Sequence, residues 1–204
     1  MEPTPKSTAP AADADPLHGA ERLPPLPPQA QDEAQRAAAA LVEAGPRKAL
    51  FGPFIALLRR PELLTPVQTL GAVLRFEGVL PRRLTEFATL CIARRWRQRF
   101  EWSAHVPLAL AAGCERATLE ALRAGRRPGS MTAEEALVHD FVAELHERQG
   151  VADARYAAAC AAFGEAGVVE LVTLCGYYTL LAMVLNVART ATAPASDPLA
   201  TLPD

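Results

Sequence analysis

The sequence predicts an all-α fold, and three observations support this prediction. From Ala30 onward the apolar residues recur three or four positions apart, which is the spacing of one helix face. No apolar/polar alternation survives more than a few residues, and no Asn-Gly pair marks a hairpin. Proline, glycine and capping residues stand between the periodic segments. We therefore expect one helical domain in this 204-residue chain.

The N-terminal half of the domain contains three expected helices. The first covers 29–45 and a short apolar one covers 49–60, and each is followed by a proline that ends it. Thr65 resembles an N-cap with Pro66 at the first helical position, which would open a third helix over 67–78.

The helical patterns continue to the end of the domain. Pro81 opens the next one, a Thr132–Glu135 capping box precedes another, and Asp153 is expected to cap a third. The expected helices cover residues 82–96, 100–113, 136–150, 154–164 and the long apolar stretch 171–188.

Both ends of the chain are expected to be flexible. Residues 1–29 are rich in proline and alanine, include the run PPLPP and have no apolar period, so they cannot bury enough surface to offset their ordering entropy. The predicted organisation is a flexible arm over 1–29, a helical domain over 30–192 and a flexible tail over 193–204.

Charge and cysteine usage limit the classes of partner. The formal net charge is only −2, so no overall field would attract nucleic acid or an anionic membrane. The four cysteines have no CxxC spacing, and no apolar signal segment precedes them, which favours reduced thiols and a cytoplasmic location. These cysteines are Cys91, Cys114, Cys160 and Cys175.

The stretch 171–188 is uncharged and just long enough to cross a membrane. Asn186 and the Tyr177-Tyr178 pair disfavour a span, as does the absence of a second span or a basic flank. We expect this helix to lie in the core or in an oligomer interface, and we expect no membrane partner.

Glu101 and His105 stand four positions apart, so on a helix they share one face. Such pairs are often surface ion pairs. Here Phe100, Trp102 and Val106 leave little room for a solvated face, and buried acid–imidazole pairs concentrate at functional sites. On spacing alone both interpretations stay open.

Glu86 lies on the preceding helix, near the border of its apolar face. A turn at 97–100 would make the two helices antiparallel. Glu86 and His105 would then lie far apart along the helix axes, unless the connection or a neighbouring subunit brings them together.

Metal and nucleic-acid sites are not expected. Di-iron bundles need Glu-x-x-His on two helices, and no such second motif accompanies Glu101 and His105. His139 and His146 stand among charged residues, which is typical of a solvated face. The arginines at 94–99 form a single run, which favours a solvated turn with affinity for phosphate or carboxylate over nucleic-acid binding.

The segment LPRRLTEFATLCIARRWRQRFEWSAHVPLALAAGCERATLEALRAG resembles the core of the carboxymuconolactone decarboxylase family, whose superfamily includes alkyl hydroperoxidase D. The shared features are an acid in the first helix, the unit Glu101-Trp102-x-x-His105, a small-residue end and a following short helix. The resemblance covers about residues 50–190. It implies an alkyl hydroperoxidase D-like all-α domain that forms trimers or hexamers and uses no organic cofactor.

The family that the chain resembles has two branches with different chemistry. In the peroxidase branch a CxxC pair precedes the histidine, and a glutamate in the earlier helix passes protons to the thiol. The cysteine positions correspond here to Gln98 and Glu101, while Glu86 and His105 occupy the ends of the relay. Because the thiols are absent, we expect no CxxC peroxidase activity.

The decarboxylase branch lacks the cysteine pair, as this chain does. The resemblance implies cofactor-independent decarboxylation, or a related proton transfer, on a small carboxylated lactone or keto acid. It makes His105 the general acid/base and Glu101 and Glu86 its relay carboxylates. Trp102 is then a pocket wall, and the arginine candidates for binding the substrate carboxylates are Arg75, Arg82 and Arg189. The alternatives are a thiol peroxidase that uses other cysteines and a non-catalytic oligomeric relative.

Overall fold

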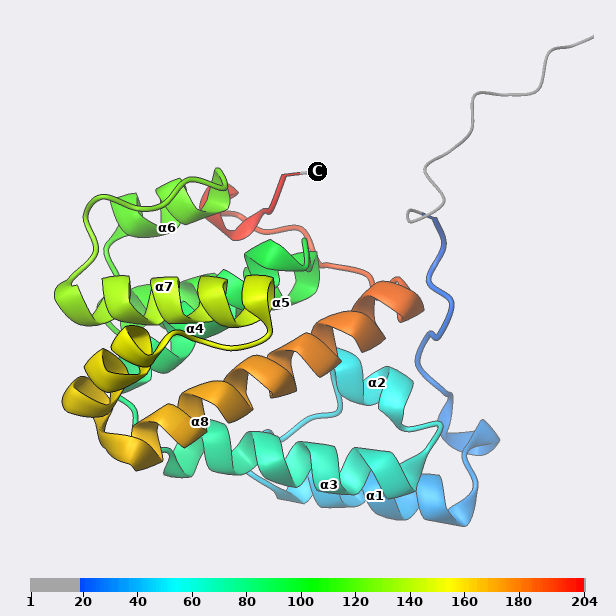
Figure 1. Ribbon diagram of the computed structural model, residues 1–204. Helices are drawn as coiled ribbons and strands as arrows, with labels where there is room; N and C mark the ends of the chain where they lie inside the picture. Colours follow the sequence, from blue (N-terminus) through cyan, green and yellow to red (C-terminus); the bar gives the residue numbers. More distant parts are fainter. Residues whose placement is uncertain (1–18, 204) are drawn as a thin grey trace, which may run out of the picture.

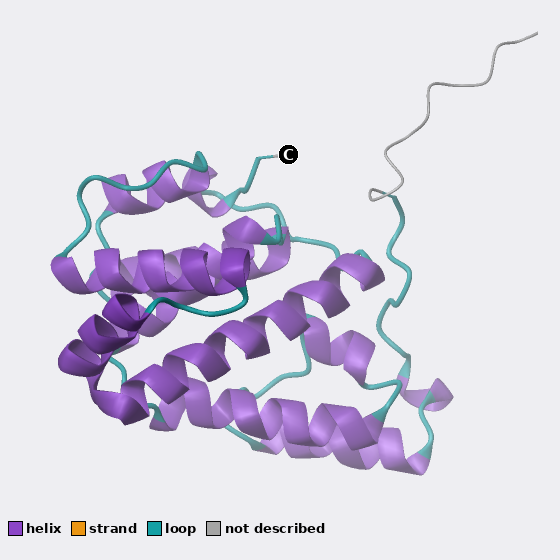
Figure 2. Cartoon of the chain, in the orientation of Figure 1, coloured by secondary structure: helices purple, strands orange, loops and turns teal. Residues whose placement is uncertain are grey.

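A computed structural model describes residues 19–203 of the chain, and within these residues every regular element is a helix (Figure 2). The predicted all-α class is therefore confirmed for the described part. Most of the predicted N-terminal arm, residues 1–18, lies outside the described residues, as does residue 204.

Eight α-helices form the described fold, together with three short turns of other helical types. The helices are α1 (Glu33–Ala44), α2 (Pro53–Leu57), α3 (Pro61–Ala72), α4 (Arg82–Arg95), α5 (Arg99–Ala111), α6 (Arg116–Arg123), α7 (Ala133–Arg148) and α8 (Asp153–Ala188). The turns are the 3-10 turns η1 (Pro28–Ala30) and η3 (Pro198–Ala200) and the π-helical turn η2 (Val73–Glu77).

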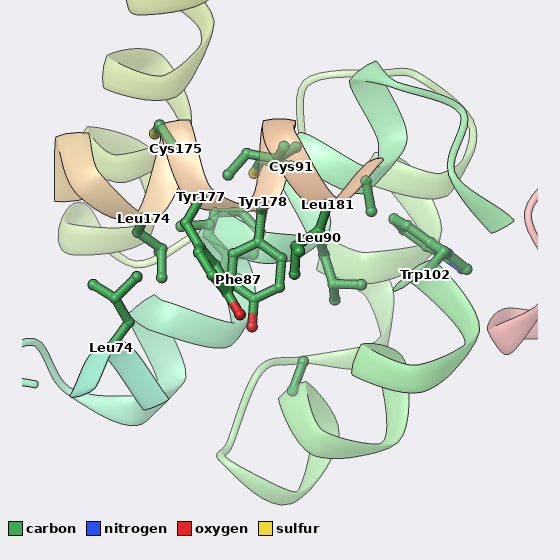
Figure 3. Packing of buried hydrophobic residues seen from close by; sticks show 14 of the residues in the cluster. Leu74, Phe87, Leu90, Cys91, Trp102, Leu174, Cys175, Tyr177, Tyr178 and Leu181 are labelled. Carbon is green, nitrogen blue, oxygen red and sulfur yellow. The ribbon is translucent and has the colours of Figure 1, made fainter. Parts of the chain in front are cut away.

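Helix α4 is the centre of the core. It packs against α5, α7 and α8, and Leu84, Phe87, Leu90 and Ile92 are fully buried on it. Helix α8 runs diagonally across the molecule, with α7 on one side and α3 on the other (Figure 1). Side chains from α4, α5 and α8 therefore meet in the interior, where Figure 3 shows part of their packing.

Several local signals form as the sequence predicts. Thr132 and Glu135 make a reciprocal capping box at the start of α7. Gly164 has φ +70°, which interrupts α8 where the first of two predicted helices ends. A second capping box, between Asp32 and Gln35, begins α1 and was not predicted.

Several helix starts differ from the prediction, and α1 and α2 each begin four residues later than expected, at Glu33 and Pro53. The third helix begins at Pro61 and not after Thr65. Proline suits the first helical position, because the N–H that it lacks would have no partner within the helix there. Pro66 then lies within α3. Asp153 is the first residue of α8, and Ala152 precedes it as the N-cap without a side-chain hydrogen bond.

Residues 193–203, the predicted tail, pack on the domain. Leu199 and Leu202 are buried, and the Trp102 indole N–H donates to the Leu199 carbonyl oxygen at 2.7 Å. Residues 19–29 of the predicted arm also make contacts. Arg22 N–H donates to the Ala188 carbonyl oxygen at 2.7 Å.

Among the described helices, α8 is the one long and apolar enough to cross a membrane by length and composition, and half of its most apolar window is buried in the fold. A core helix of a soluble protein passes the same criteria. The buried side includes Leu171, Leu174, Tyr178 and Leu185. The predicted place in the core therefore holds for one side of α8, and the other side is exposed.

Candidate active site

A buried acid–imidazole pair joins α4 to α5. His105 Nδ1 lies 2.6 Å from Glu86 Oε2, and both side chains are almost fully buried. The expected separation of these residues was wrong. Glu86 precedes Arg97 by 11 positions and His105 follows it by 8, so in a hairpin their levels differ by only about 4.5 Å at 1.5 Å per residue. The Glu86 and His105 side chains are long enough to meet across this difference in level.

The pair leaves His105 suited to act as a base. Burial lowers the pKa of His105, and the hydrogen bond and charge of Glu86 oppose this shift only in part. The imidazole is therefore neutral near pH 7, and its Nδ1–H donates to the Glu86 carboxylate. This tautomer leaves the Nε2 lone pair available. The Tyr178 ring packs edge-on against His105 at a centroid distance of 5.2 Å.

Glu101 does not share in this hydrogen bond. Its backbone N–H donates to Gln98 Oε1 at 3.1 Å, which caps α5. The side chain is 3% exposed, and its Oε2 is buried without a hydrogen-bond partner. Burial raises the pKa of Glu101 to about 8, against the opposing charge of Arg75. At neutral pH this carboxyl is therefore mainly protonated.

Glu101 and His105 both line a partly open cavity of about 170 Å³. The aromatic part of its wall comes from Phe51, Phe54 and Phe100. The polar part of its wall comes from Arg47, Arg75, Glu101, His105, Tyr177 and Tyr178. Figure 3 shows the hydroxyls of Tyr177 and Tyr178 directed to the same side of α8. The cavity thus combines an apolar wall with two cations, an acid and an imidazole.

Two arginines enter the cavity from irregular segments. Arg47 belongs to the connection between α1 and α2, stacks over Phe54 at 4.6 Å and donates to Tyr177 Oη at 3.4 Å. Arg75 belongs to the π-helical turn η2, a helix type that is frequent at functional sites. Each arginine has a buried Nε without a hydrogen-bond partner.

The charges of these arginines are not balanced within the cavity. Burial lowers the pKa of Arg47, and the neighbouring Arg75 charge lowers it further. Glu101, which lines the same cavity, is mainly protonated for the reason given above. A bound carboxylate would supply the negative charge, and acceptors for the two Nε–H groups that have no partner.

Two glycines make room for the cavity wall. A Cβ at Gly71 of α3 would overlap Tyr177 Oη and Arg47 Nη2. A Cβ at Gly52 would overlap the Phe100 ring, and Gly52 has φ +56°. Both positions therefore require glycine, which has no side chain.

Three sequence candidates lie away from the cavity. Trp102 is packed in the core and bonded to Leu199, apart from the tyrosine pair (Figure 3), so its predicted role as a pocket wall is wrong in this chain. The Arg82 side chain is 64% exposed, and its Nε lies 3.8 Å from Glu86 Oε1. Arg189 ends α8 and lines a different hollow, beside Gln98. Of the proposed arginines, only Arg75 lines the cavity.

The sequence argument missed Arg47, Tyr177 and Tyr178. The tyrosine pair carried a signal, since two adjacent phenols in an uncharged apolar helix need polar partners. Arg47 carried none, because its position depends on how the α1–α2 connection folds back over α8.

The cysteines are not placed to act in the cavity. None of the four lines the cavity. Burial raises the pKa of the Cys91 thiol, and it raises those of Cys114 and Cys175 to about 12. Gln98, which the family resemblance places at a cysteine position, caps α5 and donates to Asn186 Oδ1 at 3.0 Å.

Larger hollows lie on the surface, and some of their charged side chains form ion pairs. One of about 710 Å³ between α7 and the start of α8 contains Glu144, which is bonded to Arg155 at 3.1 Å. Another of about 420 Å³ contains the predicted arginine turn, where Arg95 pairs with Glu147. Within residues 19–203, no three His, Cys, Asp or Glu side chains are grouped to hold a metal ion.

Comparisons with models of protein families, with curated proteins and with solved structures gave no match for this chain. Its function is therefore inferred from the residues and their geometry.

Proposed function

We propose that this chain is a carboxymuconolactone decarboxylase-like enzyme with an alkyl hydroperoxidase D-like fold. It would catalyse decarboxylation, or a related proton transfer, on a small carboxylated lactone or keto acid without an organic cofactor. One observation carries the proposal: the Glu86–His105 pair opens onto a cavity that also contains the unbalanced arginines Arg47 and Arg75.

The geometry supports a division of roles. Arg47 and Arg75 hold a substrate carboxylate through charge-assisted hydrogen bonds. The bond from the reacting carbon to a second carboxylate breaks, CO₂ leaves, and the electron pair moves into the substrate carbonyl. His105 takes up a proton from solvent at Nε2 and passes it to that carbon, and Glu86 holds the imidazole in place.

The cavity limits the size of the substrate. Its volume of about 170 Å³ is below the roughly 300–1,000 Å³ of pockets that bind drug-sized ligands. This suits one small ring or a short keto acid. The aromatic wall of Phe51, Phe54 and Phe100 would exclude water from the carbon that is protonated.

The alternatives have less support in the geometry. A thiol peroxidase needs an accessible thiolate, and burial raises the pKa of Cys91, Cys114 and Cys175. A non-catalytic relative has no need for a neutral imidazole and a protonated carboxyl on one cavity wall.

We also propose that the chain forms a homo-oligomer through α8. Apolar side chains recur every three or four positions on the exposed side of this helix, with Gly176 between them. They are Val169, Val172, Leu180, Met183 and Val187, which we call the α8 stripe. The stripe carries no charge, and Gly176 has open space around it, so a second copy of α8 can approach closely.

Purified protein tested against γ-carboxymuconolactone, related carboxylated lactones and β-keto acids is the direct test. We expect loss of the lactone absorbance or release of CO₂ with at least one acid, and its abolition in His105→Ala. If no acid of this panel turns over, the proposal is wrong.

A further inference from the structure

Glu101 presents an unused polar atom to the cavity. Its Oε2 is buried and has no hydrogen-bond partner, although the side chain lines the cavity beside His105. A buried polar group without a partner costs free energy, so such atoms in a cavity wall mark the place of a ligand. Glu101 and His105 thus face the same space from one helix.

The titratable and charged groups near Glu101 come from several elements. Arg75 lies on η2, Arg47 on the α1–α2 connection, Tyr177 and Tyr178 on α8, and Glu86 on α4. None of them hydrogen-bonds to Glu101 Oε2. Glu86 is engaged with His105, and Tyr177 Oη accepts from Arg47.

The carboxyl of Glu101 and the imidazole of His105 are shifted in opposite directions. Burial outweighs the Arg75 charge and raises the pKa of Glu101 to about 8, so it holds its proton where the His105 imidazole has lost one. Two groups shifted in opposite directions within one site are suited to act as acid and base. Tyr178 is less suited to release a proton, because burial raises the pKa of its phenol far above neutrality.

We propose that neutral Glu101 donates its proton to the carbonyl oxygen of the substrate, and that the site thereby also catalyses hydrogen exchange at the carbon beside that carbonyl. This inference rests on the proposed function. It specifies that the substrate has a carbonyl group next to a carbon that carries an exchangeable proton. It replaces the ionised relay role that the family resemblance implies for Glu101.

The proposed hydrogen exchange proceeds through an enol. His105 Nε2 takes a proton from the carbon, the C–H bond breaks, and its electron pair forms the C=C bond of the enol. The carbonyl π pair moves to oxygen, which takes the Glu101 proton. The imidazolium is then paired with Glu86, and the new Glu101 carboxylate faces Arg75. The reverse step returns a proton to carbon, and in D₂O that atom becomes deuterium.

Proton NMR in D₂O tests the inference with 2-oxobutanoate and 5-oxotetrahydrofuran-2-carboxylate as probes. We expect the wild-type protein to accelerate loss of the signal of the protons beside the carbonyl in at least one probe. Glu101→Leu, which removes the donor, should slow exchange by about 100-fold, the usual loss for one such donor. Glu101→Gln keeps an N–H donor, so exchange should fall less but lose its dependence on pH near 8.

The matched control is Glu120→Gln, which changes an exposed carboxyl on α6 and should leave exchange as in the wild type. Circular dichroism identifies variants that fail to fold. Infrared titration of the folded protein supplies a measurement without substrate. The carbonyl band of a protonated carboxyl should be present at neutral pH and absent in Glu101→Gln.

The outcomes separate this inference from the proposed function. Decarboxylation without exchange, exchange that is unchanged in Glu101→Leu, or absence of the infrared band each overturns the inference alone. Absence of both exchange and decarboxylation overturns the proposed function as well.

Discussion

Glu86 Oε2 accepts a hydrogen bond from His105 Nδ1 over 2.6 Å, between two helices that are consecutive in the chain. The carboxylate fixes the imidazole tautomer and stabilises the imidazolium when it forms. Glu86→Gln should therefore lower kcat by at least about 100-fold with little change in KM. Steady-state kinetics, with Glu115→Gln as an exposed control, measure this effect. Equal kcat values in the two variants would show that the Glu86–His105 hydrogen bond takes no part in the reaction.

Substitution of either cavity arginine should weaken substrate binding. Arg47→Met and Arg75→Met each remove a charged donor while keeping most of the side-chain volume, and we expect KM to rise about 10- to 100-fold. Arg60→Met is the control, since that exposed side chain pairs only with Glu62 at the surface. A KM increase as large in Arg60→Met would show that net charge, not the cavity, governs binding.

Gly71→Ala tests how the cavity wall is built. The added methyl group would overlap Tyr177 Oη and Arg47 Nη2, so both groups must move. We expect KM to rise and the melting temperature to fall. Gly150→Ala, where nothing lies within 4 Å of the new Cβ, should change neither. Unchanged kinetics in a well-folded Gly71→Ala protein would contradict the described positions of Arg47 and Tyr177.

Stability should decrease with rising pH because of Glu101. Its folded pKa of about 8 lies above the unfolded value of 4.5, so its favourable contribution is complete below pH 4.5 and is lost as pH rises through 8. The loss amounts to at most about 5 kcal/mol. Urea unfolding of wild type and Glu101→Gln at several pH values measures the difference, in which the opposite contribution of His105 cancels. A difference independent of pH would show that Glu101 is ionised in the folded protein.

Charge placed on the α8 stripe should separate the subunits. Val169 and Met183 are 66% and 46% exposed, so Val169→Glu and Met183→Glu cost the monomer little but put an unpaired charge in the interface. Sedimentation velocity should show a trimer or hexamer for the wild type and smaller species for the variants. A monomeric wild-type protein would refute the proposed assembly.

The helical class and most boundaries could be predicted because their causes are local. A capping box such as Thr132–Glu135, or a break at Gly164, depends on residues a few positions apart. The start of α3 was misplaced because Pro61 and Pro66 could each occupy the first position of a helix. The helix begins at Pro61, and Pro66 lies inside it.

The site was only partly predictable because it depends on contacts that are distant in sequence. Glu86 and His105 were identified, but their contact follows from the register of the α4–α5 hairpin. Arg47 is brought to Tyr177 across 130 positions, and no local pattern encodes this. Trp102 was assigned to the pocket from the family resemblance, and no local pattern encodes its hydrogen bond to Leu199, 97 positions away.

Rescue of His105→Ala by imidazole is the most direct test of proton transfer at the Glu86–His105 pair. The substitution leaves a space beside Glu86 that free imidazole can fill. With the panel of carboxylated lactones and β-keto acids, we predict that the folded variant is inactive alone and regains turnover as imidazole is added. Wild-type turnover by His105→Ala without imidazole would contradict the account.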